Sequence, residues 1–165
     1  MRTKLQQAFL HQMEENQRLV HKVCKIYTDN PDDHEDLFQE IVLQLWKAFP
    51  NYRAEAKFST WAYKIALNTA ITLFRKREKQ PKVDADKEIL NLHIKSDEVD
   101  EESEKIQIMY EAIHQLNDIE KALIMMFLDD KPYKEIAELL SISEGNARIK
   151  MMRTRDKLKT LIQHK

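Results

Sequence analysis

The stretch KFSTWAYKIALNTAITLFRKR, from Lys57 to Arg77, predicts one long helix with two different sides, and the chain is organised around it. It contains neither glycine nor proline, and the hydroxyl of Ser59 or Thr60 can cap its first turn. At about 100° per residue, its apolar residues gather on one side, which we expect to pack inward. That side consists of Ala62, Ile65, Ala66, Ala70, Leu73 and Phe74.

The opposite side of this stretch is polar, and its residues recur at every fourth position. Trp61 and Tyr63 lie near its start, and Arg75 lies at its basic end. Aromatic rings for base stacking, polar groups for base edges and cations for phosphates are what single-strand nucleic-acid binders use. An ordinary core helix with a solvated face would show the same periodicity. The polar stripe consists of Thr60, Lys64, Asn68, Thr72 and Lys76.

The composition indicates a soluble, nearly all-helical protein of one domain or two small ones. The chain has 165 residues, 33% of them charged, with a single glycine and four prolines. No apolar run approaches the roughly 18 residues of a membrane span, and the first residues do not resemble a secretory segment. Cys24 is the only cysteine, so we expect no disulfide, no metal centre and a cytoplasmic location.

The first half contains two further predicted helices, separated by a break at residues 29–31. The first covers Leu5 to Tyr27, with Cys24 packed as a small hydrophobe. The second follows the acidic run Asp32–Asp36 and is apolar on more than one side, so it is either deeply buried or has a second partner. Its polar patch could equally be plain solvated surface. The patch consists of Asp36, Gln39, Glu40 and Gln44.

The charge changes sign after the basic end of the 57–77 helix. Residues 84–104 hold nine acidic and two basic residues, a net charge of −7. Like charges at this density oppose compaction. We therefore expect an extended linker between two domains.

The last third of the chain predicts a helix-turn-helix. Asn117 or Asp118 caps one helix, a helix covers Tyr133–Leu140, and a tight turn at 141–143 follows. Ser143 caps the last helix, which runs from Glu144 to about Gln163.

The last helix has one inward side and a basic outward side. We expect Ala147, Met151, Thr154, Leu158 and Leu161 to pack inward. From Glu144 to the end there are seven basic and two acidic residues, a net charge of +5, which is typical of a reader of duplex DNA. A merely solvated basic helix is the alternative. The outward residues, which could meet guanine edges and thymine methyls, are Arg148, Ile149, Met152 and Arg153.

Four stretches in this order resemble the extracytoplasmic-function (ECF) sigma factors of bacterial RNA polymerase, in the sigma-70 family. Asp36–Glu40 resembles the polymerase-contact motif, and Phe58–Asn68 resembles the promoter-melting helix. Tyr133–Ala137 and Ala147–Arg153 resemble the helix-turn-helix. The departures are Thr72, Asn146, Ile149 and Lys150, where the family often has Asp, Thr, Ser and Arg; these bear on which promoter is read.

The resemblance implies an all-α fold of two small helical domains joined by a flexible acidic linker. The domains are residues 1–80 and the helix-turn-helix domain 103–165, with the linker at 81–102. The implied function is promoter specificity, with no enzymatic activity, catalytic residue or cofactor. The implied partners are promoter DNA and core RNA polymerase, through the clamp of its largest subunit and the flap of its second largest. Whether an anti-sigma factor also binds is not decided by the sequence.

The resemblance also implies three sets of site residues. The polymerase-binding set is Asp36, Leu37, Gln39, Glu40 and Gln44. The set for single-stranded promoter DNA is Thr60, Trp61, Tyr63, Lys64, Asn68, Thr72 and Arg75. The set for duplex promoter DNA is Arg148, Ile149, Lys150, Met152 and Arg153.

Two other classes of protein remain as alternatives. A helix-turn-helix regulator that is not a polymerase subunit would leave the 57–77 helix unexplained. A helical adaptor or inhibitor would leave the basic last helix unexplained. An enzyme fits least, because the sequence has no Gly-rich phosphate loop, no Cys/His metal spacing and no nucleophile elbow. His11, His34 and His114 are isolated in sequence, so we expect surface histidines.

Overall fold

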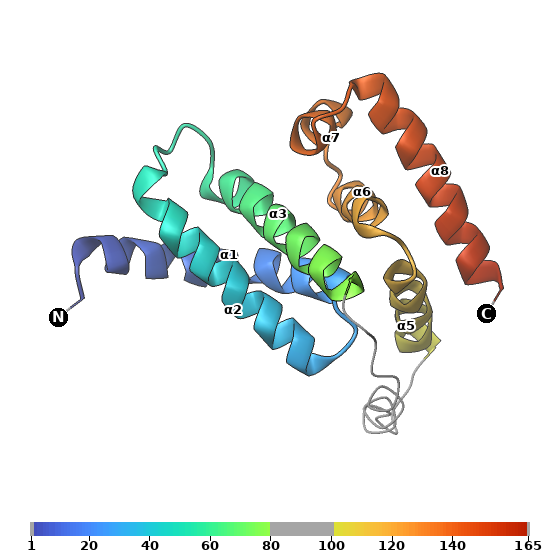
Figure 1. Cartoon of the computed structure of the whole chain (residues 1–165), viewed down its shortest axis with the longest axis horizontal. Coiled ribbons are helices and arrows are strands. Elements are labelled where there is room, and N and C mark those ends of the chain that lie inside the picture. The colour runs from blue at the N-terminus through green and yellow to red at the C-terminus, as the bar shows by residue number, and fades with distance from the viewer. Residues whose placement is uncertain (1, 80–100, 165) are drawn as a thin grey trace. The chain divides into compact units, whose positions relative to one another are not determined.

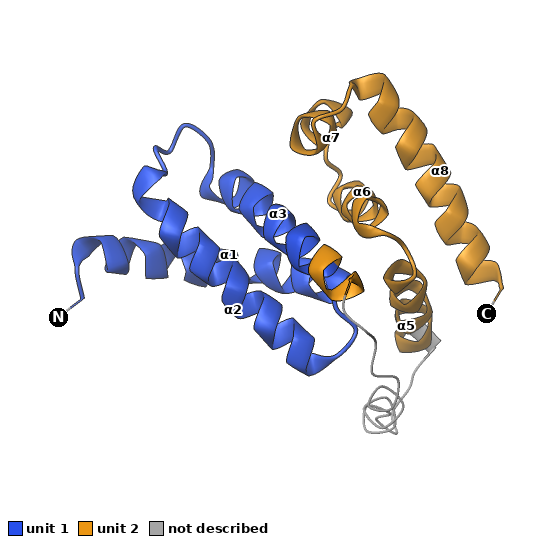
Figure 2. Ribbon diagram, viewed as in Figure 1, with its two compact units in different colours: residues 1–74 blue, residues 75–165 orange. Residues whose placement is uncertain are grey.

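The computed structural model describes residues 2–79 and 101–164, and every regular element in these ranges is a helix (Figure 1). The chain divides into two compact units, residues 1–74 and 75–165 (Figure 2). The expectation of a flexible linker falls mostly on residues outside the described ranges. Helix α5 begins at Glu101, two residues before the domain start that the sequence predicts. None of the described helices combines the length and apolarity that crossing a membrane requires.

The first unit is built from α1 (Lys4–Tyr27), α2 (Pro31–Ala48), a short 3₁₀ turn (Phe49–Asn51) and most of α3 (Phe58–Glu78), whose last residues, from Arg75 on, belong to the second unit. Thr3 caps α1 in a capping box with Gln6, and Asn30 caps α2 through the backbone N–H of Asp33. Helices α1 and α2 pack together, and aromatic rings join both ends of the unit. Phe9 contacts Trp46 at one end, and Tyr27 contacts Phe74 at the other.

Helix α1 is bent at Asn16, where the backbone leaves the helical region (φ −120°, ψ 15°). The Asn16 side-chain amide donates to the carbonyl of Gln12 at 2.7 Å. A short polar side chain that bonds the backbone in this way competes with the regular ladder and favours a kink. Beyond the bend, Cys24 is fully buried as expected, and burial raises the pKa of its thiol to about 12.

Helix α3 begins at Phe58, so the expectation of a cap at Ser59 or Thr60 was wrong, because both lie inside the first turn. Packing sets this start: the Phe58 ring is 6% exposed and contacts Phe49 and Tyr52. The inward side of α3 includes the expected alanines together with Tyr63 and Leu67, while Ile65, Leu73 and Phe74 are half-buried. The buried residues of α3 are Phe58, Ala62, Tyr63, Ala66, Leu67 and Ala70.

The second unit contains α5 (Glu101–His114), α6 (Asp118–Leu128), α7 (Tyr133–Leu140) and α8 (Glu144–Gln163). Asn117 caps α6 in a capping box with Glu120, and Ser143 caps α8, as the sequence predicts. Helix α8 packs against α5, α6 and α7. The core of this unit therefore forms around the inner side of α8.

Lys121 joins α5 to α6 from inside the core. Its side chain is 1% exposed, and its Nζ donates to the carbonyls of Ile113, His114 and Leu116 at 2.9, 2.8 and 2.9 Å. An ammonium has three donors, and all three are used here. The Ile113 and His114 carbonyls lie in the last turn of α5 and the Leu116 carbonyl lies just beyond it. Because a cation is favoured at the C-terminal end of a helix, Lys121 acts as an internal cap.

Candidate functional site

The predicted polymerase patch lies on α2 and is only partly accessible. Asp36 and Gln39 are exposed, while Glu40 and Gln44 are half-buried and bonded to each other through Gln44 Nε2 and Glu40 Oε1 at 2.9 Å. Leu37, also in the predicted polymerase-binding set, is 2% exposed and lies in the core of the free protein. It lies four residues before Ile41, on the inward side of α2.

An apolar hollow of about 350 Å³ lies beside this patch, between α1 and α2. Leu43, one of its lining residues, is 43% exposed. The second apolar side of α2 therefore faces outward and is available to a partner. The hollow is lined by Phe9, Phe38, Gln39, Val42, Leu43 and Trp46.

The polar stripe on α3 is exposed along its length. Thr60, Lys64, Asn68 and Thr72 are all open to solvent, as is Arg75 at the basic end. The Thr72 hydroxyl donates to the carbonyl of Asn68 at 2.8 Å, so it is turned toward its own helix. The opposite side of α3 is in the core, which holds the stripe on a rigid support.

The two aromatic residues assigned to base stacking behave differently. Trp61 is half-buried, with its ring centroid 4.9 Å from Tyr52 and 5.4 Å from Phe58, so packing fixes its orientation. Tyr63 is 2% exposed, so in the free protein its ring lies in the core and not on the exposed stripe. Residues 63, 66, 67 and 70 follow the helical repeat and point into the core together.

The helix-turn-helix is formed by α7, the turn at 141–143 and α8. Ser141 takes the left-handed conformation (φ 56°), and the N–H of Ile142 donates to the carbonyl of Ala137 at 3.0 Å. The Ser143 hydroxyl accepts from the N–H of Asn146 at 3.1 Å and starts α8. These bonds hold the angle between the two helices.

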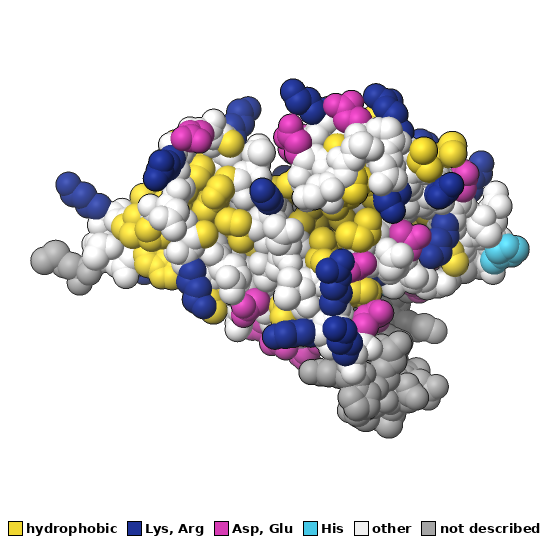
Figure 3. All heavy atoms as spheres, turned by 45° about the horizontal axis from the view of Figure 1, so that its top comes forward, with side chains coloured by type: hydrophobic (Ala, Val, Ile, Leu, Met, Phe, Trp, Pro, Cys, Tyr) yellow, Lys and Arg dark blue, Asp and Glu magenta, His cyan; other side chains and the backbone are white. Residues whose placement is uncertain are grey.

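The five duplex-DNA candidates on α8 are all exposed. Ile149 is 47% and Met152 58% exposed, which is unusual for apolar side chains on a helix that packs its other side in the core. Arg148 is held with its guanidinium 4.5 Å from the centre of the Tyr133 ring, a contact that sequence reasoning missed. Figure 3 shows basic and hydrophobic side chains together at the molecular surface. The exposed set is Arg148, Ile149, Lys150, Met152 and Arg153.

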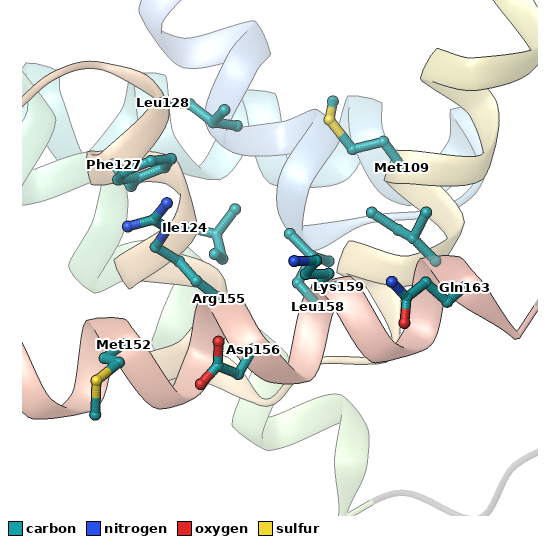
Figure 4. A pocket seen from close by; sticks show the side chains of 11 residues that line it. Met109, Ile124, Phe127, Leu128, Met152, Arg155, Asp156, Leu158, Lys159 and Gln163 are labelled. Atoms are coloured by element: carbon teal, nitrogen blue, oxygen red, sulfur yellow. The ribbon is translucent and has the colours of Figure 1, made fainter.

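A second apolar groove, of about 550 Å³, lies within the C-terminal unit (Figure 4). Phe127 and Leu128, at the end of α6, are 39% and 42% exposed here. The Arg155 guanidinium lies 4.3 Å from the centre of the Phe127 ring and covers part of it. Further apolar residues from α5, α6 and α8 complete the groove: Met109, Ile124, Met152, Leu158 and Ile162.

His34 is not the isolated surface residue that the sequence suggests. Its Nε2 lies 3.0 Å from Nδ1 of His21, and the His21 ring stacks on Phe38 at 4.5 Å. Burial lowers the pKa of His34 first, and the nearby His21 and Lys25 lower it further. Within residues 2–79 and 101–164, no group of three or more His, Cys, Asp or Glu side chains is placed to hold a metal ion.

Family models and relatives agree on one family. The model for Sigma-70 region 2 matches residues 13–80, and the model for Sigma-70, region 4 matches residues 106–158. The chain is 27% identical to the ECF RNA polymerase sigma-E factor of Haemophilus influenzae, over 88% of this chain and 84% of that protein. It is 28% identical to the sigma-E factor of Escherichia coli, over 88% and 83%.

Two solved structures share the fold. The sigma factor RpoE of Bartonella quintana, in complex with the anti-sigma factor NepR, has a TM-score of 0.70 and 17% identity, over 94% of this chain and 97% of that one. CnrH in complex with the cytosolic domain of CnrY has a TM-score of 0.62 and 18% identity, over 96% and 90%. Since two successive regions of one family match most of the chain, and relatives of the same type match along most of their length, this chain belongs to the sigma-70 family and is an RNA polymerase sigma factor of the ECF group.

Proposed function

We propose that three helices divide the work of this sigma factor: α2 binds core polymerase, α3 binds the melted promoter strand, and α8 reads duplex DNA. The observation that carries the proposal is that each helix packs one side in a core and leaves a chemically distinct side exposed. Such a side is rigid, so it loses little conformational freedom when it binds. The division corresponds to domains at residues 1–80 and 103–165 with a linker at 81–102.

The polymerase surface combines the polar patch on α2 with the hollow beside it. Asp36, Gln39 and Glu40 would face the clamp of the largest subunit. Leu43, exposed on the same helix, would add an apolar contact next to these polar groups. A polar patch beside a buried apolar anchor is the arrangement that specific protein interfaces use.

The single-strand surface consists of the α3 stripe and the edge of Trp61. Flipping a base costs a few kcal/mol, and stacking and base-edge contacts must offset that cost. Trp61 is already fixed by Tyr52 and Phe58. Lys64 and Asn68 lie one and two turns further along the exposed side. Arg75 would hold the phosphates at the far end.

The duplex surface is the outward side of α8, which would enter the major groove of the upstream promoter element. Arg148 and Arg153 offer bidentate donors for guanine, and Ile149 and Met152 offer apolar contacts for thymine methyls. The net charge of +5 from residue 144 onward supports attraction to the phosphates.

The groove of the C-terminal unit would take an apolar segment of the polymerase flap. Phe127, Leu128 and Met152 are exposed around a concave surface, and Arg155 and Lys159 lie at its rim. An anti-sigma factor would compete for the same kind of surface; the structural neighbour RpoE forms a complex with the anti-sigma factor NepR. A cytoplasmic, non-enzymatic role without a cofactor completes the proposal.

Reconstituted transcription tests the proposal directly. Core RNA polymerase, the full chain and fragmented genomic DNA are combined, and the transcript starts are sequenced. We expect a limited set of starts that share two upstream elements and that depend on the added chain. Two results would favour a helix-turn-helix regulator that is not a polymerase subunit. The transcript starts could be the same without the chain, or the chain could bind DNA but not core polymerase.

A further inference from the structure

The only glycine of the chain, Gly145, lies where the fold does not require one. It is the second residue of α8, it is exposed, and its φ is not positive. A Cβ atom built at this position meets nothing within 4 Å. Alanine would therefore fit here without strain and would favour the helix more than glycine does.

Elsewhere the chain avoids glycine even where backbone geometry favours it. Ala54, Asp130 and Ser141 all have positive φ, at 56°, 54° and 56°, and glycine would take this conformation at lower cost. The sequence thus places a side chain at every described position with positive φ and omits one at a regular helical position. Neither backbone conformation nor space in the free protein therefore accounts for a glycine at position 145.

Gly145 is also the first member of the proposed reading side of α8. Residues three, four and seven positions later on a helix share its face. In α8 these are Arg148, Ile149 and Met152, which are all exposed. A side chain at 145 would therefore project beside the residues that carry the base contacts.

We propose that Gly145 is a positioning residue that sets how deeply α8 enters the major groove of duplex promoter DNA, a step that rests on the proposed function. Without a side chain at 145, the main chain of the first turn meets the DNA directly. A Cβ or a longer side chain there acts as a wedge that lifts Arg148 and Ile149 away from the base edges. Phosphate contacts, which reach the rim of the groove, depend less on this depth.

The experiment compares full-length variants assembled with core polymerase. Wild-type holoenzyme first selects duplexes from a random-sequence library, and a selected and an unrelated duplex then serve as probes. We expect Gly145→Ala to lower affinity for the selected duplex at least about fivefold, the loss of one good base contact. Gly145→Leu should lower it further, and neither should change affinity for the unrelated duplex. Thr160→Ala is the control, because it raises helix propensity at an exposed position about 22 Å along the same helix.

Two further readouts separate positioning from folding. The melting temperature of Gly145→Ala should equal or exceed that of the wild type, because alanine favours the helix. Arg148→Ala should lower affinity for the selected duplex much less in the Gly145→Leu background than in the wild type. The reason is that the lifted helix has already lost the contact between Arg148 and the base edge. A lowered melting temperature, or additive losses in the double variant, would overturn the inference.

The outcomes also distinguish this inference from the proposed function. If wild-type holoenzyme selects no duplex sequence, the proposed function fails. If it selects one and Gly145→Ala binds that duplex equally well, the positioning role alone is wrong. Equal losses of affinity for the selected and the unrelated duplex, or weaker binding to core polymerase, would also contradict a role at the base edges.

Discussion

Lys121 shows how one buried charge organises the C-terminal unit. Its ammonium donates to three carbonyls at and just beyond the end of α5, and it reaches them from the first turn of α6. Hydrogen bonds to a charged donor are stronger than neutral ones, and buried acceptors without a partner are costly. Lys121 therefore joins the end of α5 to the start of α6 by strong hydrogen bonds.

Replacing Lys121 with methionine should destabilise the C-terminal unit by about 2–4 kcal/mol, because the volume is kept while buried carbonyls lose their donor. Urea unfolding followed by circular dichroism measures the loss. Lys134→Met, at an exposed position of α7, is the control and should change stability little. Equal midpoints for the two variants would contradict the role of Lys121.

The contact between His21 and His34 predicts that the N-terminal unit is destabilised by acid. Because the pKa of His34 is lowered in the fold, the folded state favours the neutral ring, and the unfolded chain binds the proton more readily. The contribution of His34 to stability is therefore complete above its ordinary pKa of 6.5 and is lost as the pH falls below that value.

We expect the stability of the wild type to fall more steeply than that of His34→Gln when the pH is lowered from about 7.5 to about 5. Thermal unfolding across this range measures the slope. His164→Gln removes an exposed histidine near the C-terminus and should leave the wild-type slope unchanged. If the stability of His34→Gln fell with pH in parallel with that of the wild type, the His21–His34 pair would not control the loss of stability in acid.

At the scale of elements, α3 and α8 have similar lengths but carry different chemistry. Helix α3 presents amide, hydroxyl and lysine groups beside a fixed tryptophan, which suits unpaired bases. Helix α8 presents arginines and exposed apolar groups, which suit the major groove. The two helices should therefore act at different steps of initiation.

Arg153→Ala should weaken duplex promoter binding by about 1–3 kcal/mol while leaving strand opening nearly normal once the promoter is saturated. Asn68→Ala should do the opposite, with closed-complex binding intact and opening impaired. Gel-shift titration measures the first step, and permanganate footprinting of unpaired thymines measures the second.

Lys76→Ala, at the end of the α3 stripe, serves as the comparison variant for general loss of charge. It should reduce binding by a similar factor on all sequences, since phosphate contacts carry no sequence information. If Asn68→Ala and Arg153→Ala both lowered only duplex affinity, α3 would be a plain structural element.

At the scale of the molecule, each unit has its own core. In the first, α1 packs on α2 and the aromatic residues close around the start of α3. In the second, α8 packs on α5, α6 and α7. A unit whose apolar side chains are covered by its own helices should fold without the other.

Fragments covering residues 1–79 and 101–165 should therefore each show a helical circular dichroism spectrum and a cooperative thermal transition. The first fragment keeps α3 whole, since that helix runs to Glu78. A fragment ending at residue 66 cuts α3 in its buried part and should lose cooperativity. An unfolded 1–79 or 101–165 fragment would refute independent folding.

The helices, the caps at Asn117 and Ser143, the inward side of α8 and the exposed stripe on α3 were all predictable from the sequence. These features are local, because the helical repeat and the cap residue lie within one segment of chain. The family resemblance likewise rested on short motifs, and the family matches confirmed it.

Which residues near those motifs are accessible depends on how the helices pack against one another. Leu37 and Tyr63 lie within the resembling stretches yet are buried, because neighbouring helices cover the sides on which they lie. His21 and His34 are 13 residues apart and meet only because α1 packs on α2. The Arg148–Tyr133 contact depends in the same way on how two helices meet. Periodicity describes one helix at a time, so contacts between helices, and the burial they cause, lay beyond it.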